Sequence, residues 1–196
     1  MSLLKFDNGL TDEKGAIWNL HGSAVIDTLT PIFGAGSLSI PGTSGYVETS
    51  SPIFQNASSQ DVTIELFAVI RSLSSEGVLF DFRPYETNGY YPMLYYSTDG
   101  RLIFTWNGST VIRSAPGIIQ PSLKPVHIAY VRSGVNHMVF ADGVQVAPNW
   151  IDGANYGAVS NIRVGRSAWN SSIAFPNVLI DEFRITKGVA RYTENF

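Results

Sequence analysis

The feature that most constrains this fold is a series of short alternating strands joined by Asx-Gly turns. Residues 125–146 show it best, because Val126, Ile128 and Tyr130 share one face of an extended segment. Asp142-Gly143 then supplies the positive backbone φ angles that a two-residue hairpin turn needs. This stretch predicts an antiparallel sheet.

The same pattern recurs along the chain. Asp99-Gly100 and Asn107-Gly108 are two further hairpin signals between alternating apolar runs. Val62–Ile70 is the strongest predicted strand, and its second half is apolar on both faces, which favours a central place in a sheet. No span keeps a 3.6-residue period over ten residues, so at most single helical turns are expected, at 51–59 and 188–192. The sequence predicts an all-β sandwich of two antiparallel sheets.

Composition limits the possible classes of function. The chain has 196 residues, enough for one sandwich domain spanning 1–196, and only 15% of its residues are charged. Its net charge of −3 argues against a nucleic-acid partner, which would require a basic stripe. The absence of cysteine excludes disulfides and thiolate metal sites.

Hydropathy also argues against a membrane protein. No segment approaches the roughly 20 apolar residues of a membrane-spanning helix. The start of the chain, MSLLKFDNG, lacks the apolar core of a signal peptide. We therefore expect a soluble protein without membrane insertion.

Four motifs, in their order and spacing, resemble the laminin-G-like, concanavalin A-like jelly roll. They are Gly34-Ala-Gly36-Ser-Leu38 with Gly45-Tyr-Val47, Val62-Thr-Ile-Glu-Leu66, His127-Ile-Ala-Tyr-Val-Arg132 with Phe140-Ala-Asp-Gly143, and Ile162-Arg-Val-Gly165 with Ile180-Asp-Glu-Phe-Arg-Ile185. Together they cover almost the whole chain. The tryptophan that often precedes the histidine in this family is absent, since Lys124-Pro125-Val126 stands there.

The last of these motifs continues through residues 180–192, a run that is similar to the ending of laminin-G-like domains in bacteriophage virion proteins. The resemblance implies a noncatalytic module of the virion surface, on a tail fibre, the tail tip or the capsid as a head decoration. It also implies assembly in the host cytoplasm, which fits the absence of a signal peptide. Its partner would be a host-surface carbohydrate or another virion protein, and we expect a homo-oligomer. One alternative is a purely structural assembly domain that oligomerises. A glycan-active hydrolase of the same fold is less favoured.

Catalysis finds little support in the carboxylates. Retaining glycoside hydrolysis needs two carboxylates about 5 Å apart, and the enzymatic relatives carry Glu-x-Asp-x-Glu along a strand, which this chain lacks. Asp181 and Glu182 are neighbours, so on a regular strand they would point to opposite faces. The three histidines are scattered, and no enzyme is predicted.

The resemblance implies one metal site. Related sandwiches often bind a structural calcium ion between an early acidic turn and a late strand, and Asp7 and Asp181 are the matching positions. The alternative is that Asp7 forms an Asx turn and Asp181 accepts backbone N–H bonds.

Carbohydrate binding would require exposed aromatic faces beside planar hydrogen-bonding groups. The candidates chosen here are Trp106, Trp150, Asn155, Tyr156, Trp169 and Asn170, with Tyr90, Tyr91, Tyr95, Tyr96 and Asn107 as further possibilities. The segments around Trp150 and Trp169 look like loops, where binding residues concentrate. The alternative is that most of these rings belong to the core or to subunit contacts.

Overall fold

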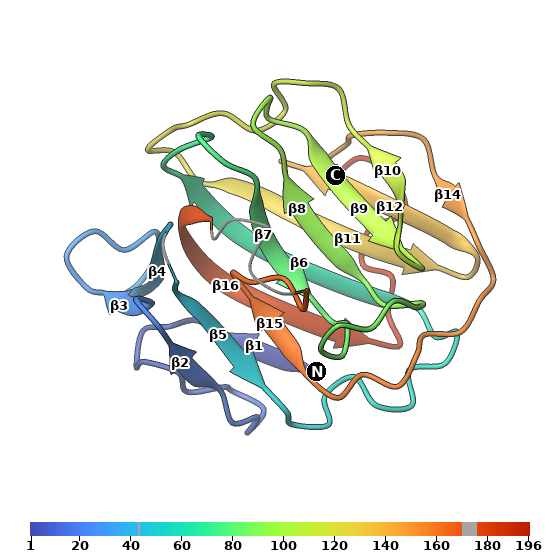
Figure 1. Cartoon of the computed structure of the whole chain (residues 1–196), viewed down its shortest axis with the longest axis horizontal. Coiled ribbons are helices and arrows are strands. Elements are labelled where there is room, and N and C mark those ends of the chain that lie inside the picture. The colour runs from blue at the N-terminus through green and yellow to red at the C-terminus, as the bar shows by residue number, and fades with distance from the viewer. Residues whose placement is uncertain (43, 170–175) are drawn as a thin grey trace.

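The computed structural model describes residues 1–42, 44–169 and 176–196, and in these ranges the regular structure consists of strands alone (Figure 1). The strands are β1 (Ser2–Leu4), β2 (Asn19–His21), β3 (Val25–Asp27), β4 (Ser37–Pro41), β5 (Tyr46–Thr49), β6 (Val62–Ile70), β7 (Gly77–Asp81), β8 (Met93–Tyr96), β9 (Leu102–Trp106), β10 (Ser109–Arg113), β11 (Val126–Ser133), β12 (Asn136–Ala141), β13 (Val144–Gln145), β14 (Trp150–Ile151), β15 (Ile162–Val164) and β16 (Asn177–Lys187). The helical turns expected at 51–59 and 188–192 are wrong, because residues 51–59 form turns and bends and residues 188–192 are a turn residue followed by irregular chain.

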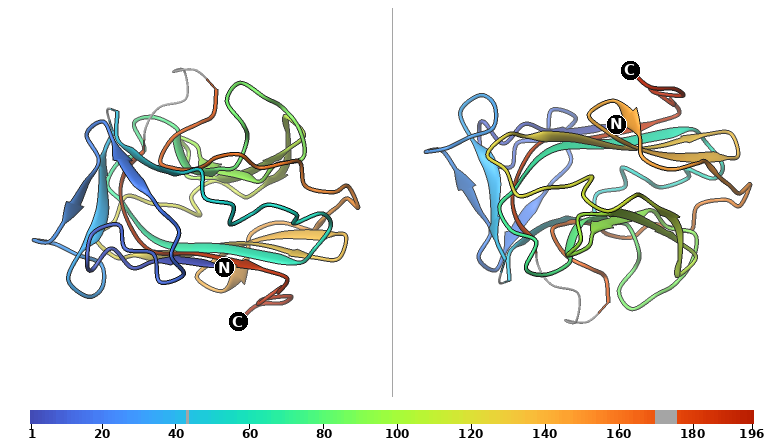
Figure 2. Two further views of the ribbon diagram at one scale, coloured as in Figure 1. Left: turned by 90° about the horizontal axis from the view of Figure 1, so that it is seen from below. Right: turned by 90° about the horizontal axis from the view of Figure 1, so that it is seen from above.

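The strands form two antiparallel sheets packed face to face (Figure 2). The larger sheet has the order β13-β12-β11-β6-β16-β4-β3, with β1 added to β16 and β14 added to β12. The smaller sheet has the order β10-β9-β8-β7-β15-β5-β2. Both chain ends lie on the side of the larger sheet, and the C-terminal segment is the outermost layer there (Figure 2). The predicted antiparallel two-sheet sandwich is confirmed.

Two of the three predicted Asx-Gly hairpin turns have left-handed backbone angles at both residues. Asp142 and Gly143 have φ of 47° and 77°, and Asn107 and Gly108 have φ of 51° and 74°. Both dipeptides thus have the angles of a type I′ turn, which matches the twist of the strands it joins. Strand β6 lies between β11 and β16, the central position that its doubly apolar sequence predicted.

The core lies between the sheets. Alternate residues of β6 and β11 point inward, and residues of β8 and β9 meet them from the smaller sheet. A second, smaller apolar cluster lies on the outer face of the larger sheet. It contains Ala129, Val131, Met138 and Phe140, and the C-terminal segment covers it.

Strand β16 contains a β-bulge that the alternation pattern did not predict. Its register against β6 shifts between Asp181 and Arg184, and Glu182 has a φ of 49°. At this point β16 also changes its other neighbour from β4 to β1. The extra residue of a bulge interrupts strict alternation. Asp181 and Glu182 therefore both lie on the outer side of the sheet, and their expected opposite orientation is wrong.

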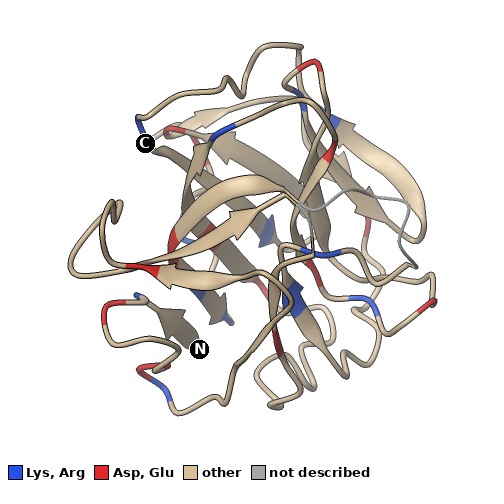
Figure 3. Ribbon diagram, turned by 60° about the vertical axis from the view of Figure 1, so that its left-hand side comes forward, with Lys and Arg blue, Asp and Glu red and all other residues tan. Residues whose placement is uncertain are grey.

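Charge is spread thinly over the molecule. Acidic and basic positions are distributed over both sheets and their loops rather than collected in one basic stripe (Figure 3). No helix in the described ranges is long and apolar enough to cross a membrane.

Candidate binding surface

The structure divides the predicted carbohydrate-binding residues between the surface and the core. Trp150 and Trp169 are 38% and 37% exposed, and Asn155 is also exposed. Trp106 and Tyr156 are buried in the core. Asn170 lies outside the described residues.

Trp106 and Tyr156 cannot present an exposed ring face to a sugar, which corrects the expectation for both. Trp106 ends β9 on its inner side, where its indole Nε1 donates to the Asp152 carboxylate over 3.2 Å. Tyr156 packs edge-on against Trp106, and its hydroxyl lies 3.3 Å from that of Tyr130. Both side chains instead hold the loop that follows β14.

A buried histidine completes this support. The Asp152 carbonyl oxygen lies 3.2 Å from His137 Nε2, and the Tyr130 hydroxyl lies 2.8 Å from His137 Nδ1. Because a carbonyl can only accept, Nε2 carries the ring proton and Nδ1 accepts from Tyr130. Burial lowers the pKa of His137 to about 4, so the ring is neutral at pH 7. We call Trp106, Tyr130, His137, Asp152 and Tyr156 the loop clamp.

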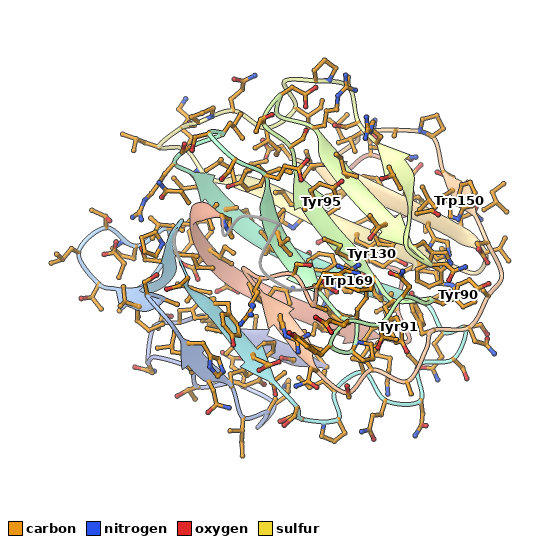
Figure 4. The ribbon with its side chains drawn as sticks, viewed as in Figure 1. Tyr90, Tyr91, Tyr95, Tyr130, Trp150 and Trp169 are labelled. Carbon is orange, nitrogen blue, oxygen red and sulfur yellow. The ribbon has the colours of Figure 1, made fainter. Side chains whose placement is uncertain are left out.

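The loop clamp supports two exposed aromatic side chains. Trp150 pairs with His137 across β14 and β12, so it lies two residues before the clamped Asp152. Tyr90 is 39% exposed, and its ring centroid lies 5.7 Å from that of Trp106. Both residues lie at the same end of the sandwich, at the right of Figure 4. Trp150, Asn155 and Tyr90 together form what we call the end surface.

Trp169 belongs to a different part of the molecule and lies well away from Trp150 in Figure 4. Asp81, which is fully buried, accepts a hydrogen bond from the Ala168 N–H over 2.7 Å and pairs with Arg83 over 2.6 Å. Arg83 also donates to the Ser167 hydroxyl over 3.2 Å. This buried ion pair fixes the backbone immediately before Trp169. The two exposed tryptophans therefore do not form one site.

Asp7 and Asp181, the predicted calcium ligands, are brought to the same turn. Asp7 Oδ1 accepts the Ala35 N–H over 2.5 Å, and Asp181 Oδ2 accepts the Phe33 N–H over 3.1 Å. Asp181 also accepts from the Ser37 hydroxyl and the Glu182 N–H. Burial raises the pKa of Asp181, and the nearby negative charge of Asp7 raises it further.

This donor set does not fit calcium as it stands. Calcium takes six to eight oxygen ligands, whereas the oxygens of Asp181 and one of Asp7 already accept hydrogen bonds. Across the residues described, no group of three acidic, histidine or cysteine side chains is placed to hold a metal ion. Calcium binding at Asp7 and Asp181 stays a prediction.

A pocket of about 230 Å³, which we call the outer-face pocket, lies on the outer face of the larger sheet. It is lined by Glu65, Phe67, His127, Glu182, Arg184, Tyr192 and Phe196. Glu65 is 4% exposed. Its Oε2 lies 2.8 Å from the Tyr192 hydroxyl and 3.1 Å from His127 Nε2. Burial alone would raise the pKa of Glu65, but these hydrogen bonds outweigh it and hold the pKa below its usual value.

Sequence reasoning missed this pocket because its parts come from distant segments. Glu65 stood out only as a lone carboxylate in a central strand, and residues 188–192 were expected to form at most one helical turn. One available signal was the polar position of Glu65 among the apolar residues of β6, since a buried charge needs a partner. The identity of that partner was set by the return of residues 188–196 across the sheet.

Comparison with known protein families identifies the family to which this chain is similar. Residues 41–193 match the family described as "Concanavalin A-like lectin/glucanases superfamily", a laminin-G type. A search of curated proteins found no match.

Solved structures with this fold include several botulinum neurotoxin binding domains. The serotype G binding domain superposes with a TM-score of 0.71 at 15% identity, over 95% of this chain and 47% of that chain. A neurotoxin DC binding domain in complex with rat synaptotagmin II gives 0.69 at 15% identity, over 100% of this chain and 48% of that chain. A type C structure, described as requiring two ganglioside molecules for cell entry, gives 0.66 at 16% identity, over 100% and 48% of the two chains. This chain spans about half the length of these structures, and the likeness concerns the fold.

Proposed function

The chain belongs to the concanavalin A-like lectin/glucanases superfamily, and on that basis we propose that it is a noncatalytic binding module of a bacteriophage virion surface. Its partner is host-surface carbohydrate or another virion protein, and the module sits on a tail fibre, a tail tip or the capsid. The phage assignment is supported by the similarity of residues 180–192 to the endings of laminin-G-like virion domains.

The observation that carries the binding role is the end surface. Trp150 and Tyr90 keep more than a third of their surface in solvent, although the loop clamp holds the backbone after β14 and packs against Tyr90. A pre-positioned aromatic ring loses little conformational entropy when a sugar stacks on it. Exposed Asn155 adds a planar hydrogen-bonding group in the loop that follows β14. The solved structures that share this fold are neurotoxin binding domains, one of them in complex with rat synaptotagmin II, and this chain matches about half of each.

A noncatalytic role is supported by the burial and the hydrogen bonding of Glu65 and Asp181. Glu65 is almost entirely buried, and both of its oxygens face protein donors. Asp181 accepts three hydrogen bonds from the protein. A hydrolase needs one carboxylate free to attack or to activate water and a second one to donate a proton. Neither Glu65 nor Asp181 is free in that way.

A second candidate is a structural assembly domain that oligomerises. It is favoured by two exposed apolar residues beside Trp150 at the edge of the larger sheet. Ile151 is 68% exposed and Val135 is 47% exposed. The two residues are neighbours, because the Asp152 N–H donates to the Val135 carbonyl over 2.9 Å. An exposed apolar edge of this kind is typical of protein contacts.

A glycan array with purified protein tests the first proposal, with light scattering to measure the mass. We expect selective, saturable binding that Trp150→Ala reduces at least tenfold without changing the thermal midpoint. Trp169→Ala is the matched control, because it removes an equally exposed indole elsewhere. A stable oligomer that binds no glycan and dissociates on Ile151→Asp would favour the assembly role, and release of reducing ends would favour the hydrolase.

A further inference from the structure

The outer-face pocket exists because the C-terminal segment returns over the larger sheet. Residues 188–196 lie across β6, β11 and β12, where the Phe196 N–H donates to the Gly143 carbonyl over 2.9 Å. The Tyr192 and Phe196 rings stack with centroids 3.6 Å apart. The pocket lies at the His127 end of the β11–β12 hairpin, whereas Trp150 pairs with His137 near the opposite end of that hairpin. The pocket is therefore distinct from the end surface.

Aromatic rings form the apolar part of this pocket. Phe67 contributes from β6, and Tyr192 and Phe196 contribute from the C-terminal segment. Phe67 is partly exposed, and Phe196 keeps 54% of its surface in solvent. Rings of this kind offer flat faces on which the C–H groups of a ligand can pack.

Two polar side chains in the pocket have hydrogen-bonding capacity left over. Arg184 NH1 lies 3.5 Å from Glu65 Oε1, and Arg184 NH2 lies 3.7 Å from Glu182 Oε2. Both distances exceed the usual range for a strong charge-assisted hydrogen bond. Glu182 and Arg184 thus present an acceptor and a donor side by side, the pairing that a vicinal diol can satisfy.

Charge and size narrow the class of ligand. Glu65 and Glu182 carry two negative charges, and Arg184 and Arg191 carry two positive charges, with Arg191 Nε 3.5 Å from Glu65 Oε1. Glu65 and Glu182 each face an arginine, so the pocket presents no concentrated charge of one sign that would attract an ionic ligand. A volume of about 230 Å³ is below the range of drug-sized ligands and suits a single ring.

We propose that the outer-face pocket binds one neutral pyranose ring, which stacks on the aromatic side chains and hydrogen-bonds through neighbouring hydroxyls to Glu182 and Arg184. The inference rests on the proposed carbohydrate-binding function for the class of ligand. It adds a site, separate from the end surface, that recognises a single sugar unit.

Titration with simple glycosides tests this site. The probes are the methyl glycosides of glucose, galactose, mannose and N-acetylglucosamine, with binding followed by saturation-transfer NMR and calorimetry. We expect at least one probe to bind, and Phe67→Leu and Glu182→Gln each to weaken it about tenfold, as expected for loss of one good contact.

Matched controls come from the same chain. Phe33→Leu removes a ring that contacts Phe67 edge-on but does not line the pocket. Glu86→Gln changes an exposed glutamate outside the pocket that has the same φ of 49° as Glu182. Both controls should bind the probe like the wild type.

The outcomes separate this inference from the proposed function. Loss of glycoside binding in the two pocket variants but not in Trp150→Ala supports the pocket. Loss in Trp150→Ala alone overturns the pocket and leaves the end surface as the binding site. Absence of binding by all four probes overturns the proposed pocket site. The glycan array with Trp150→Ala tests the end surface independently.

Discussion

Acidification should destabilise this protein through His137. The side chain is fully buried, and burial lowers its pKa from 6.5 to about 4. The unfolded chain therefore binds a proton near pH 6.5 that the folded protein does not accept until about pH 4. The stability that neutral His137 contributes is fully present above pH 6.5 and is lost as the pH falls toward 4. Linkage gives a loss of about 2 kcal/mol at pH 5 and about 3 kcal/mol at pH 4 and below.

The measurement is urea unfolding followed by tryptophan fluorescence at pH 7, 6 and 5. The control is His137→Gln, whose amide can still donate to the Asp152 carbonyl but does not titrate. We expect the variant to be less stable than wild type at pH 7 by about 1–3 kcal/mol, because the buried Tyr130 hydroxyl loses the hydrogen bond that it donates to His137 Nδ1.

The informative quantity is the difference between the two proteins as the pH falls. His21, His127 and the acidic residues are present in both, so their titration cancels in this difference. Wild type should lose stability toward pH 5 faster than His137→Gln, and the two curves should converge. Parallel curves over this range would refute the assignment of a lowered pKa to His137, and with it the inference that the loop clamp shields His137 from solvent.

Two further predictions follow from the site geometry. Asp81→Ala should lower the free energy of unfolding in urea by about 3–5 kcal/mol, because it leaves Arg83 buried without its carboxylate partner. The control is Asp99→Ala, at an exposed pair with Arg101, which should barely move the urea midpoint. Equal effects of the two substitutions would contradict the prediction. Millimolar calcium should leave the thermal midpoint unchanged, because Asp7 and Asp181 already accept hydrogen bonds from the turn at 33–35. A calcium-dependent rise in the midpoint that Asp181→Asn abolishes would instead establish the predicted metal site.

The sheet architecture could be predicted because its signals are local. Period-two alternation in Val62–Ile70 and the left-handed turns at Asn107-Gly108 and Asp142-Gly143 depend on neighbouring residues alone. A strand that is apolar on both faces must also lie inside a sheet, and β6 does. These patterns identified the antiparallel sandwich and most of its strands before any contact was known.

The candidate sites depended on contacts between distant segments. Composition made Trp106 and Trp150 equivalent candidates, yet the inner side of β9 buries one and the edge strand β14 exposes the other. Alternation placed Asp181 and Glu182 on opposite faces until the change of partner along β16 introduced a bulge.

The sequence by itself thus determined the strands, the turns and the class of fold, because alternation and turn chemistry act over a few residues. The tertiary structure alone decided which side chains are exposed, which carboxylates share a turn and where a pocket forms. The outer-face pocket unites Glu65 with Tyr192 across 127 positions of the chain. Such a contact depends on how the whole chain packs, and no local pattern encodes it.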